Sequence, residues 1–145
     1  MKLQTASATI SFALKLEDES AKLYEDLSKR YTKDEDVFLS FVKENRKNAV
    51  QIERAYYGVI TDAIEGCFAF GIEPEVYAVE TTLAENASYY DALVKAIEVE
   101  EKIGKFYSDA AEQSKSLMAD VPRVFMMIAK KRNARVAKLR SLYIG

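Results

Sequence analysis

The sequence lacks histidine and tryptophan, and it contains one cysteine, Cys67, in a chain of 145 residues. Without histidine, the chain has neither the commonest general base nor the commonest ligand for transition metals. A single cysteine forms no internal disulfide, no thiolate zinc site and no iron–sulfur centre. We expect Cys67 to be a small buried hydrophobic residue and not a reactive thiol. Carboxylates, guanidinium groups, amides and phenols remain as the groups available for chemistry.

Residues that interrupt helices are also scarce, with only two prolines and five glycines, which favours long helices. Apolar residues make up 49% of the chain and charged residues 30%, a composition typical of a soluble globular domain. The length suits one domain, residues 1–145, with a hydrophobic core. No apolar run is long enough for a secretory signal or a membrane span, so we expect a cytoplasmic protein with no membrane partner.

Charge is distributed unevenly along the chain, although the net charge is only −2. Residues 62–112 hold 12 acidic and 3 basic side chains, whereas residues 115–145 hold 1 acidic and 8 basic ones. Two neighbouring helices of opposite charge explain this better than binding of nucleic acid, which we do not expect.

Apolar periodicity predicts four helices, over about residues 5–31, 35–57, 88–115 and 121–143. Asp34 or Asp36 is a candidate cap for the second helix, and Asp120 followed by Pro122 marks the start of the fourth. Short connections within each pair predict two antiparallel hairpins. The long crossover, residues 58–87, has room for a short helix within 75–83. The expected fold is all-α: an antiparallel four-helix bundle with one long crossover.

An internal repeat supports two copies of one hairpin. Residues 13–24 match residues 96–107 at an offset of 83, and residues 37–58 match residues 124–145 at an offset of 87. The two offsets differ by no more than a loop-sized gap. This pattern is typical of a duplicated helical hairpin.

Six polar residues interrupt the apolar stripes of these helices. Residues three apart in the sequence share one helix face. The two asparagines of the second helix therefore lie on the same face, as do the two arginines of the fourth helix. The positions that the repeat relates are Glu17 and Glu100, Asn45 and Arg132, and Asn48 and Arg135.

The sequence resembles the rubrerythrin branch of the ferritin-like superfamily. In those bundles, one Glu from each of two helices and a Glu-x-x-His motif from each of the other two bind a pair of iron ions. The resemblance lies in the repeated frame Ala13-Leu14…Glu17…Tyr24 and Ala96-Ile97…Glu100…Tyr107. It covers roughly residues 5–57 and 88–145 and implies a ferritin-like bundle, peroxide chemistry and a tendency to self-associate.

The chain departs from this family at the metal ligands. At the two Glu-x-x-His positions it has Asn45 and Asn48, and Arg132 and Arg135. Guanidinium groups repel metal ions, so we expect no cofactor, and only Glu17 and Glu100 would remain as ligands for iron or manganese. We expect a buried network of ion pairs and amides in place of the metals.

A different helix register would leave Asn45, Arg132 or Arg135 on a solvated flank. Glu44, Glu98 and Glu101 lie beside the stripes, and we expect them to be surface charges. Tyr24 and Tyr107 are candidate hydrogen-bond donors to the central carboxylates, although packing tyrosines are commoner.

The first functional hypothesis is a non-catalytic structural or interaction protein. We expect a homodimer, with the apolar residues of the crossover either capping the bundle or forming the contact. Those residues are Phe68, Phe70, Val76, Tyr77, Tyr89 and Tyr90.

The alternative is an iron- or manganese-dependent oxidoreductase of peroxide or oxygen, with Glu17 and Glu100 joined by Glu44 or Glu101 as ligands. A pocket in which Arg132 and Arg135 bind an anion ranks last, because the two glutamates compete for the same guanidinium groups. No motif indicates a small-molecule substrate.

Overall fold

The computed structural model describes residues 2–59, 68–115 and 120–145. Its long helices are α1 (Ala6–Arg30), α2 (Glu35–Val59), α5 (Tyr89–Ser114) and α6 (Asp120–Ile144). The short elements are strand β1 (Leu3–Thr5), the 3₁₀ helix η1 (Thr32–Asp34), strand β2 (Phe68–Ile72) and helix α4 (Pro74–Tyr77). The expectation of a mostly helical protein is confirmed. Cys67 lies outside the described residues.

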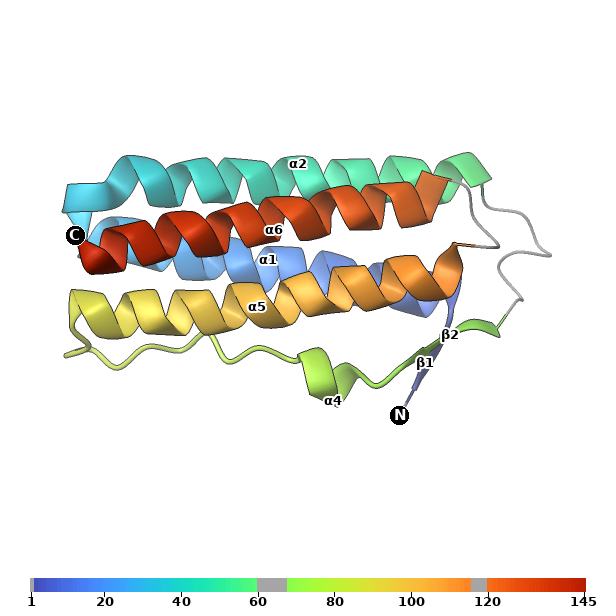
Figure 1. Cartoon of the computed structure of the whole chain (residues 1–145), viewed down its shortest axis with the longest axis horizontal. Coiled ribbons are helices and arrows are strands. Elements are labelled where there is room, and N and C mark those ends of the chain that lie inside the picture. Colours follow the sequence, from blue (N-terminus) through green and yellow to red (C-terminus); the bar gives the residue numbers. More distant parts are fainter. Residues whose placement is uncertain (1, 60–67, 116–119) are drawn as a thin grey trace.

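The four long helices lie side by side (Figure 1). Within each hairpin the helices pack along their length, α1 against α2 and α5 against α6, and the hairpins meet where α2 contacts α6 and α1 contacts α5. The chain from β2 to α5 runs back along the bundle, and α2 and α5 point the same way (Figure 1). Side chains from all four helices therefore meet at the centre.

Local capping explains where two of the helices begin. The Thr5 side chain accepts a hydrogen bond from the backbone N–H of Ala8 at 3.1 Å, which is the usual role of a threonine N-cap. Ser88 and Asp91 form a capping box at the start of α5, each side chain accepting from the other residue's backbone N–H. The carboxylate of Asp34, a candidate cap for α2, accepts a hydrogen bond from the Tyr89 hydroxyl.

The crossover differs from its prediction. β1 and β2 form a two-stranded antiparallel sheet in which Leu3 pairs with Ile72. Strands of three and five residues are too short for alternation of apolar and polar residues to reveal them in the sequence. The helix expected within 75–83 is α4, which begins earlier, at Pro74, and ends at Tyr77. Proline favours the first position of a helix because its missing N–H has no intrahelical partner there.

One part of the crossover packs onto the bundle. The Tyr77 hydroxyl donates to Asp109 on α5 at 2.5 Å, and its ring contacts Phe106, which also contacts Phe12 and Phe125. The apolar surface expected of the crossover is thus divided: Phe70 and Tyr77 are buried, Tyr89 is half-buried, and Val76 and Tyr90 are exposed. The side chain of Phe68 lies outside the described residues. Over the described ranges, no helix combines the length and apolar character that crossing a membrane requires.

Candidate functional site

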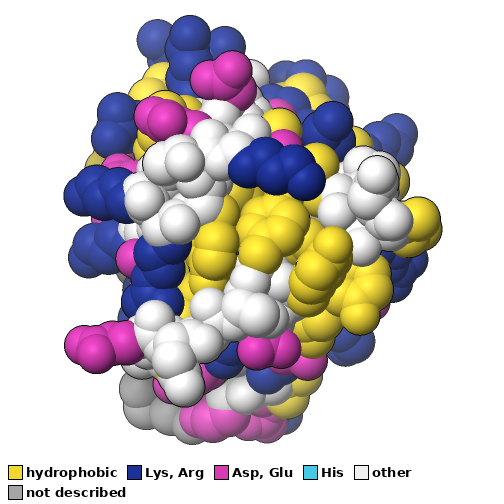
Figure 2. All heavy atoms as spheres, turned by 90° about the vertical axis from the view of Figure 1, so that its left-hand side faces the viewer, with side chains coloured by type: hydrophobic (Ala, Val, Ile, Leu, Met, Phe, Trp, Pro, Cys, Tyr) yellow, Lys and Arg dark blue, Asp and Glu magenta, His cyan; other side chains and the backbone are white. Residues whose placement is uncertain are grey.

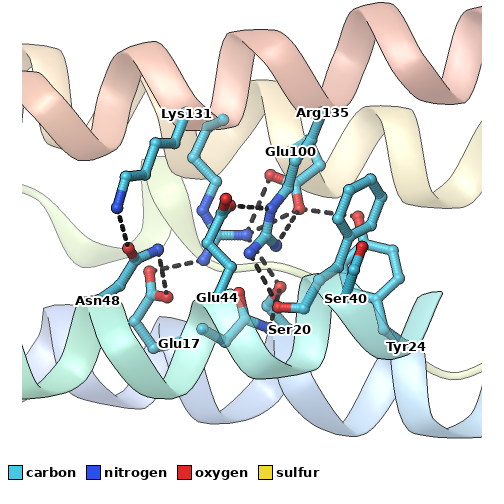
Figure 3. Close-up of polar contacts among 12 residues, drawn as sticks. Glu17, Ser20, Tyr24, Ser40, Glu44, Asn48, Glu100, Lys131 and Arg135 are labelled. Atoms are coloured by element: carbon cyan, nitrogen blue, oxygen red, sulfur yellow. Dashed lines mark hydrogen bonds and ion pairs between the residues drawn. The ribbon is translucent and has the colours of Figure 1, made fainter. Parts of the chain in front are cut away.

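The six polar residues singled out in the sequence all lie inside the bundle. Glu17 comes from α1, Glu100 from α5, Asn45 and Asn48 from α2, and Arg132 and Arg135 from α6. None of the six exposes more than 2% of its surface. The alternative register, which places the arginines or Asn45 in solvent, is therefore wrong. Figure 3 shows the carboxylates, amides and guanidinium groups pointing toward one another across the centre of the bundle.

Arg132 bridges the two central glutamates. Its Nη1 donates to both carboxylate oxygens of Glu100, at 2.7 and 3.0 Å, and its Nη2 donates to Oε2 of Glu17 at 2.6 Å. Nη1 also lies 2.9 Å from the hydroxyl of Ser20. One buried guanidinium thus neutralises carboxylates on two helices. The two glutamates are equivalent in the repeat and lie 83 residues apart in the sequence.

Arg135 extends the network toward α2. Its Nη1 donates to Glu100 Oε1 at 3.0 Å, its Nε to Glu44 Oε1 at 2.8 Å and its Nη2 to the backbone carbonyl of Phe41 at 3.0 Å. The guanidinium also lies over the rings of Phe41 and Tyr24, 4.8 and 5.6 Å from their centroids. Glu44 is only partly exposed, so treating it as a surface charge was wrong. Its position three residues after the buried Phe41 was the available signal.

The two asparagines donate hydrogen bonds to polar groups of α1. Asn48 Nδ2 donates to Glu17 Oε1 at 3.1 Å, and Asn48 Oδ1 accepts from Lys131 Nζ at 3.5 Å. Asn45 Nδ2 donates to the hydroxyl of Ser20 at 3.3 Å. Ser20 is completely buried and was missed by the sequence analysis. A small hydroxyl residue three positions after a buried glutamate reads as an ordinary small residue of the stripe.

Two tyrosines connect the repeated halves. The Tyr24 hydroxyl of the first half donates to Glu100 at 2.7 Å, and the Tyr107 hydroxyl of the second half donates to Glu17 at 2.6 Å. Complete burial, reinforced by the adjacent carboxylates, raises the pKa of both phenols well above its ordinary value. Both hydroxyls therefore remain protonated and act as hydrogen-bond donors.

The electrostatic balance of the centre depends on these contacts. Burial by itself would lower the pKa of Arg132, but the charges of Glu100 and Glu17 raise it overall, so this guanidinium remains charged. Isolated charges in a protein interior carry a large desolvation penalty, which only close and well hydrogen-bonded partners offset. The two arginines face the two central glutamates, and partly exposed Glu44 lies at the edge.

This set of donors does not fit a pair of iron ions. An iron pair needs several anionic or imidazole ligands with free lone pairs, whereas Glu17 and Glu100 already accept hydrogen bonds from Arg132 and from a tyrosine each. A cation at the centre would also lie next to two guanidinium groups. In the part of the chain that the structure describes, no three carboxylate, thiol or imidazole side chains gather closely enough to hold a metal ion.

No protein-family model, curated protein or solved structure matches this chain. The function of the site therefore rests on its own geometry. That geometry offers a buried, charge-compensated centre without an exposed nucleophile or general base among the six residues.

Replacing Arg132 by methionine should leave the carboxylates of Glu17 and Glu100 buried without their main partner. We expect the free energy of unfolding to fall by about 3–5 kcal/mol, as it does when one partner of a buried ion pair is removed. Urea titration monitored by circular dichroism measures the change.

Arg140→Met is the matched control, because Arg140 lies on the same helix but is exposed, with Glu101 3.8 Å away. An exposed pair of this kind contributes less than about 1 kcal/mol. Equal stability losses in the two variants would show that the central ion pairs are unimportant.

Because the phenols of Tyr24 and Tyr107 are buried, we predict that the protein loses stability at alkaline pH. The ordinary pKa of both groups is 10.0. Above about pH 10 the unfolded chain loses these protons while the folded protein retains them, so the free energy of unfolding should fall as the pH rises. Replacing Tyr24 and Tyr107 together by phenylalanine should reduce this alkaline decline.

The same double variant should be less stable at neutral pH, by about 1.5–3 kcal/mol for each lost hydrogen bond to a carboxylate. Tyr57→Phe, at an exposed position, should match the wild type at neutral pH. Urea titrations between pH 7 and about pH 11.5 test both statements. An unchanged alkaline slope in the double variant would mean that other groups cause the decline.

Proposed function

We propose that this protein is a ferritin-like, rubrerythrin-like four-helix bundle that has lost its di-iron site and acts as a non-catalytic structural or interaction protein. The observation that supports this most directly is the position of Arg132 between Glu17 and Glu100. These two glutamates are the residues equivalent to metal ligands in the resemblance, and the space between them is taken by a guanidinium group. An ion-pair network then performs the structural role that metal ions have in such bundles.

The exchange of hydrogen bonds between the two halves supports a common origin of the hairpins. Tyr24 and Tyr107 are equivalent in the repeat, as are Glu17 and Glu100, and each tyrosine donates to the glutamate of the other half. The pair Asn48–Glu17 likewise corresponds to Arg135–Glu100, with distances of 3.1 and 3.0 Å. A duplicated hairpin arranged about a central axis explains all of these equivalences.

The competing proposals, an iron or manganese oxidoreductase and an anion pocket, both require this network to open. A metal ligated by Glu17 and Glu100 has to displace Arg132, which would leave a guanidinium group buried without a charged partner. An anion has to compete with carboxylates that already contact Arg132 and Arg135 at 2.6–3.0 Å. We therefore rank both below the non-catalytic role. A cytoplasmic location completes the proposal, since it suits a chain with one cysteine.

The interaction surface of the proposed homodimer lies at the end of the bundle where α1 and α6 end and α5 begins. Figure 2 shows hydrophobic side chains gathered on this end. Ring contacts at 5.3–5.8 Å connect Tyr31, Tyr89, Tyr90 and Tyr143 in a row. Tyr90 and Tyr143 are 53% and 46% exposed, and Ile144 is exposed beside them. Exposed apolar surface of this kind marks protein interaction sites, and we call these five residues the aromatic end.

Restoring the ligands of the family should create a metal site if the proposed correspondence is right. The change is Asn45→Glu, Asn48→His, Arg132→Glu and Arg135→His in one variant. It should bind about two iron ions per chain, because the centre would then offer four carboxylates and two imidazoles. Elemental analysis of folded protein grown with added iron measures the content.

The unaltered protein, grown with iron and manganese, should contain neither metal in stoichiometric amounts. Near-stoichiometric metal in it would favour the oxidoreductase. A folded quadruple variant without iron would contradict the correspondence with di-iron proteins.

Charge placed on the aromatic end should dissociate the dimer. We expect sedimentation velocity to give a dimer for the unaltered protein at micromolar concentration and a monomer for Tyr90→Lys, because a lysine at an apolar interface loses its hydration. Tyr57→Lys is the control, since Tyr57 is exposed near the end of α2, at the opposite end of the bundle. A monomer for the unaltered protein would contradict the homodimer.

A further inference from the structure

A cavity of about 230 Å³ opens between α1 and α2 and reaches the central network. Two of its lining residues, Glu17 and Asn45, belong to that network and are buried. Its apolar lining comes from Leu14, Ala21 and Ala49. The short alanine side chains leave the space open, and it exceeds the volume of one water molecule, about 30 Å³ in the liquid.

One polar atom of Asn45 has no partner on the protein. Asn45 is 1% exposed, its Nδ2 donates to Ser20, and its Oδ1 has no hydrogen-bond partner among the described residues. Turning the amide over exchanges the two atoms but still leaves one of them unsatisfied. A buried polar atom without a partner destabilises the fold, so a hydrogen-bonding molecule in the cavity would remove this penalty.

The charges around the cavity indicate which kind of molecule it accepts. Three carboxylates, those of Glu17, Asp18 and Glu25, lie on its walls, against two cationic side chains. Both of these, Lys22 and Arg46, have mostly exposed side chains that already pair with Asp18 and Glu25, at 3.0 and 3.4 Å. All three carboxylates come from α1, so an anion in the cavity would face them on that wall, and α2 contributes the amide of Asn45 on the other.

We propose that this cavity binds a small primary alkylammonium ion, with its ammonium group donating to Asn45 Oδ1 and its alkyl chain against Leu14, Ala21 and Ala49. Glu17 Oε1 adds an acceptor, since only Asn48 donates to it among the described residues. Asp18 and Glu25 lie on the same walls and attract the positive charge. The site depends only on these contacts, so it stands whether or not the bundle descends from a di-iron protein.

Propylammonium chloride is the probe, added to ¹⁵N-labelled protein while the side-chain amide signal of Asn45 is followed by NMR. The signal is identified by its absence in Asn45→Leu, a variant of similar size. We expect a saturable shift with a dissociation constant on the order of 1 mM, which is reasonable for a ligand of four non-hydrogen atoms. Propanol, which lacks the charge, should bind at least about tenfold more weakly.

Three further salts separate specific binding from other effects. Sodium chloride and tetramethylammonium chloride, which has the charge but no N–H donor, should give no saturable shift. If sodium chloride or tetramethylammonium chloride gave shifts equal to those of propylammonium, the shifts would come from screening of surface charges. This result would overturn the proposal. Sodium propionate should not bind, and preferential binding of propionate would overturn the assigned charge.

Filling the cavity provides the matched pair of variants. Ala49→Met places a longer side chain on the cavity wall and should abolish the shift, whereas Val50→Met, at the exposed neighbouring position, should retain it. Circular dichroism checks that both variants are folded, and Ala21→Met replaces Ala49→Met if the latter does not fold. Retained binding in a folded cavity-filling variant, or no saturable shift in the unaltered protein, would overturn the proposal.

Discussion

The contact on which the rest of the structure depends is the one between Arg132 and the carboxylates of Glu17 and Glu100, at 2.6 and 2.7 Å. A charged group inside a helical bundle is tolerated only when its partners are close and correctly oriented. Arg132 on α6 has its partners on two other helices, α1 and α5, and Arg135 adds α2 through Glu44. Sliding any helix by one turn would separate a buried charge from its partner. The network therefore selects one register for the four helices, much as a single buried polar residue does in coiled coils.

The neutral polar groups around this contact donate further hydrogen bonds to its carboxylates. Tyr24 and Tyr107 donate to the carboxylates from the opposite repeat, and Asn48 donates to the oxygen of Glu17 that Arg132 leaves free. Two atoms of the central network, Asn45 Oδ1 and Arg132 Nε, have no hydrogen-bond partner among the described residues. The cavity between α1 and α2 opens beside Asn45. One of the two places where the network is incomplete thus coincides with the place where another molecule can enter.

Most of the helical framework was predictable because it depends on local patterns. The four long helices begin and end within a few residues of their predicted bounds, since apolar periodicity, capping residues and Pro122 act over one or two turns. The pairing of β1 with β2 joins segments more than 60 residues apart, and strands this short carry no readable alternation. Ser20 and Glu44 were missed or misassigned for a related reason. Ser20 resembles an ordinary small residue of the stripe and Glu44 lies beside the stripe, and the partner of each, Arg132 or Arg135, lies on a distant helix.

The sequence by itself determined that four amphipathic helices form and that six polar residues lie on their apolar faces, because helical periodicity assigns a face to every residue. It also determined, through the internal repeat, which of these positions are equivalent. Only the tertiary structure decided which carboxylate each guanidinium contacts, that Glu44 turns toward Arg135, and that a cavity opens beside Asn45. These outcomes depend on distances between helices of a few ångströms. Such distances follow from the packing of all side chains together and not from any one stretch of the chain.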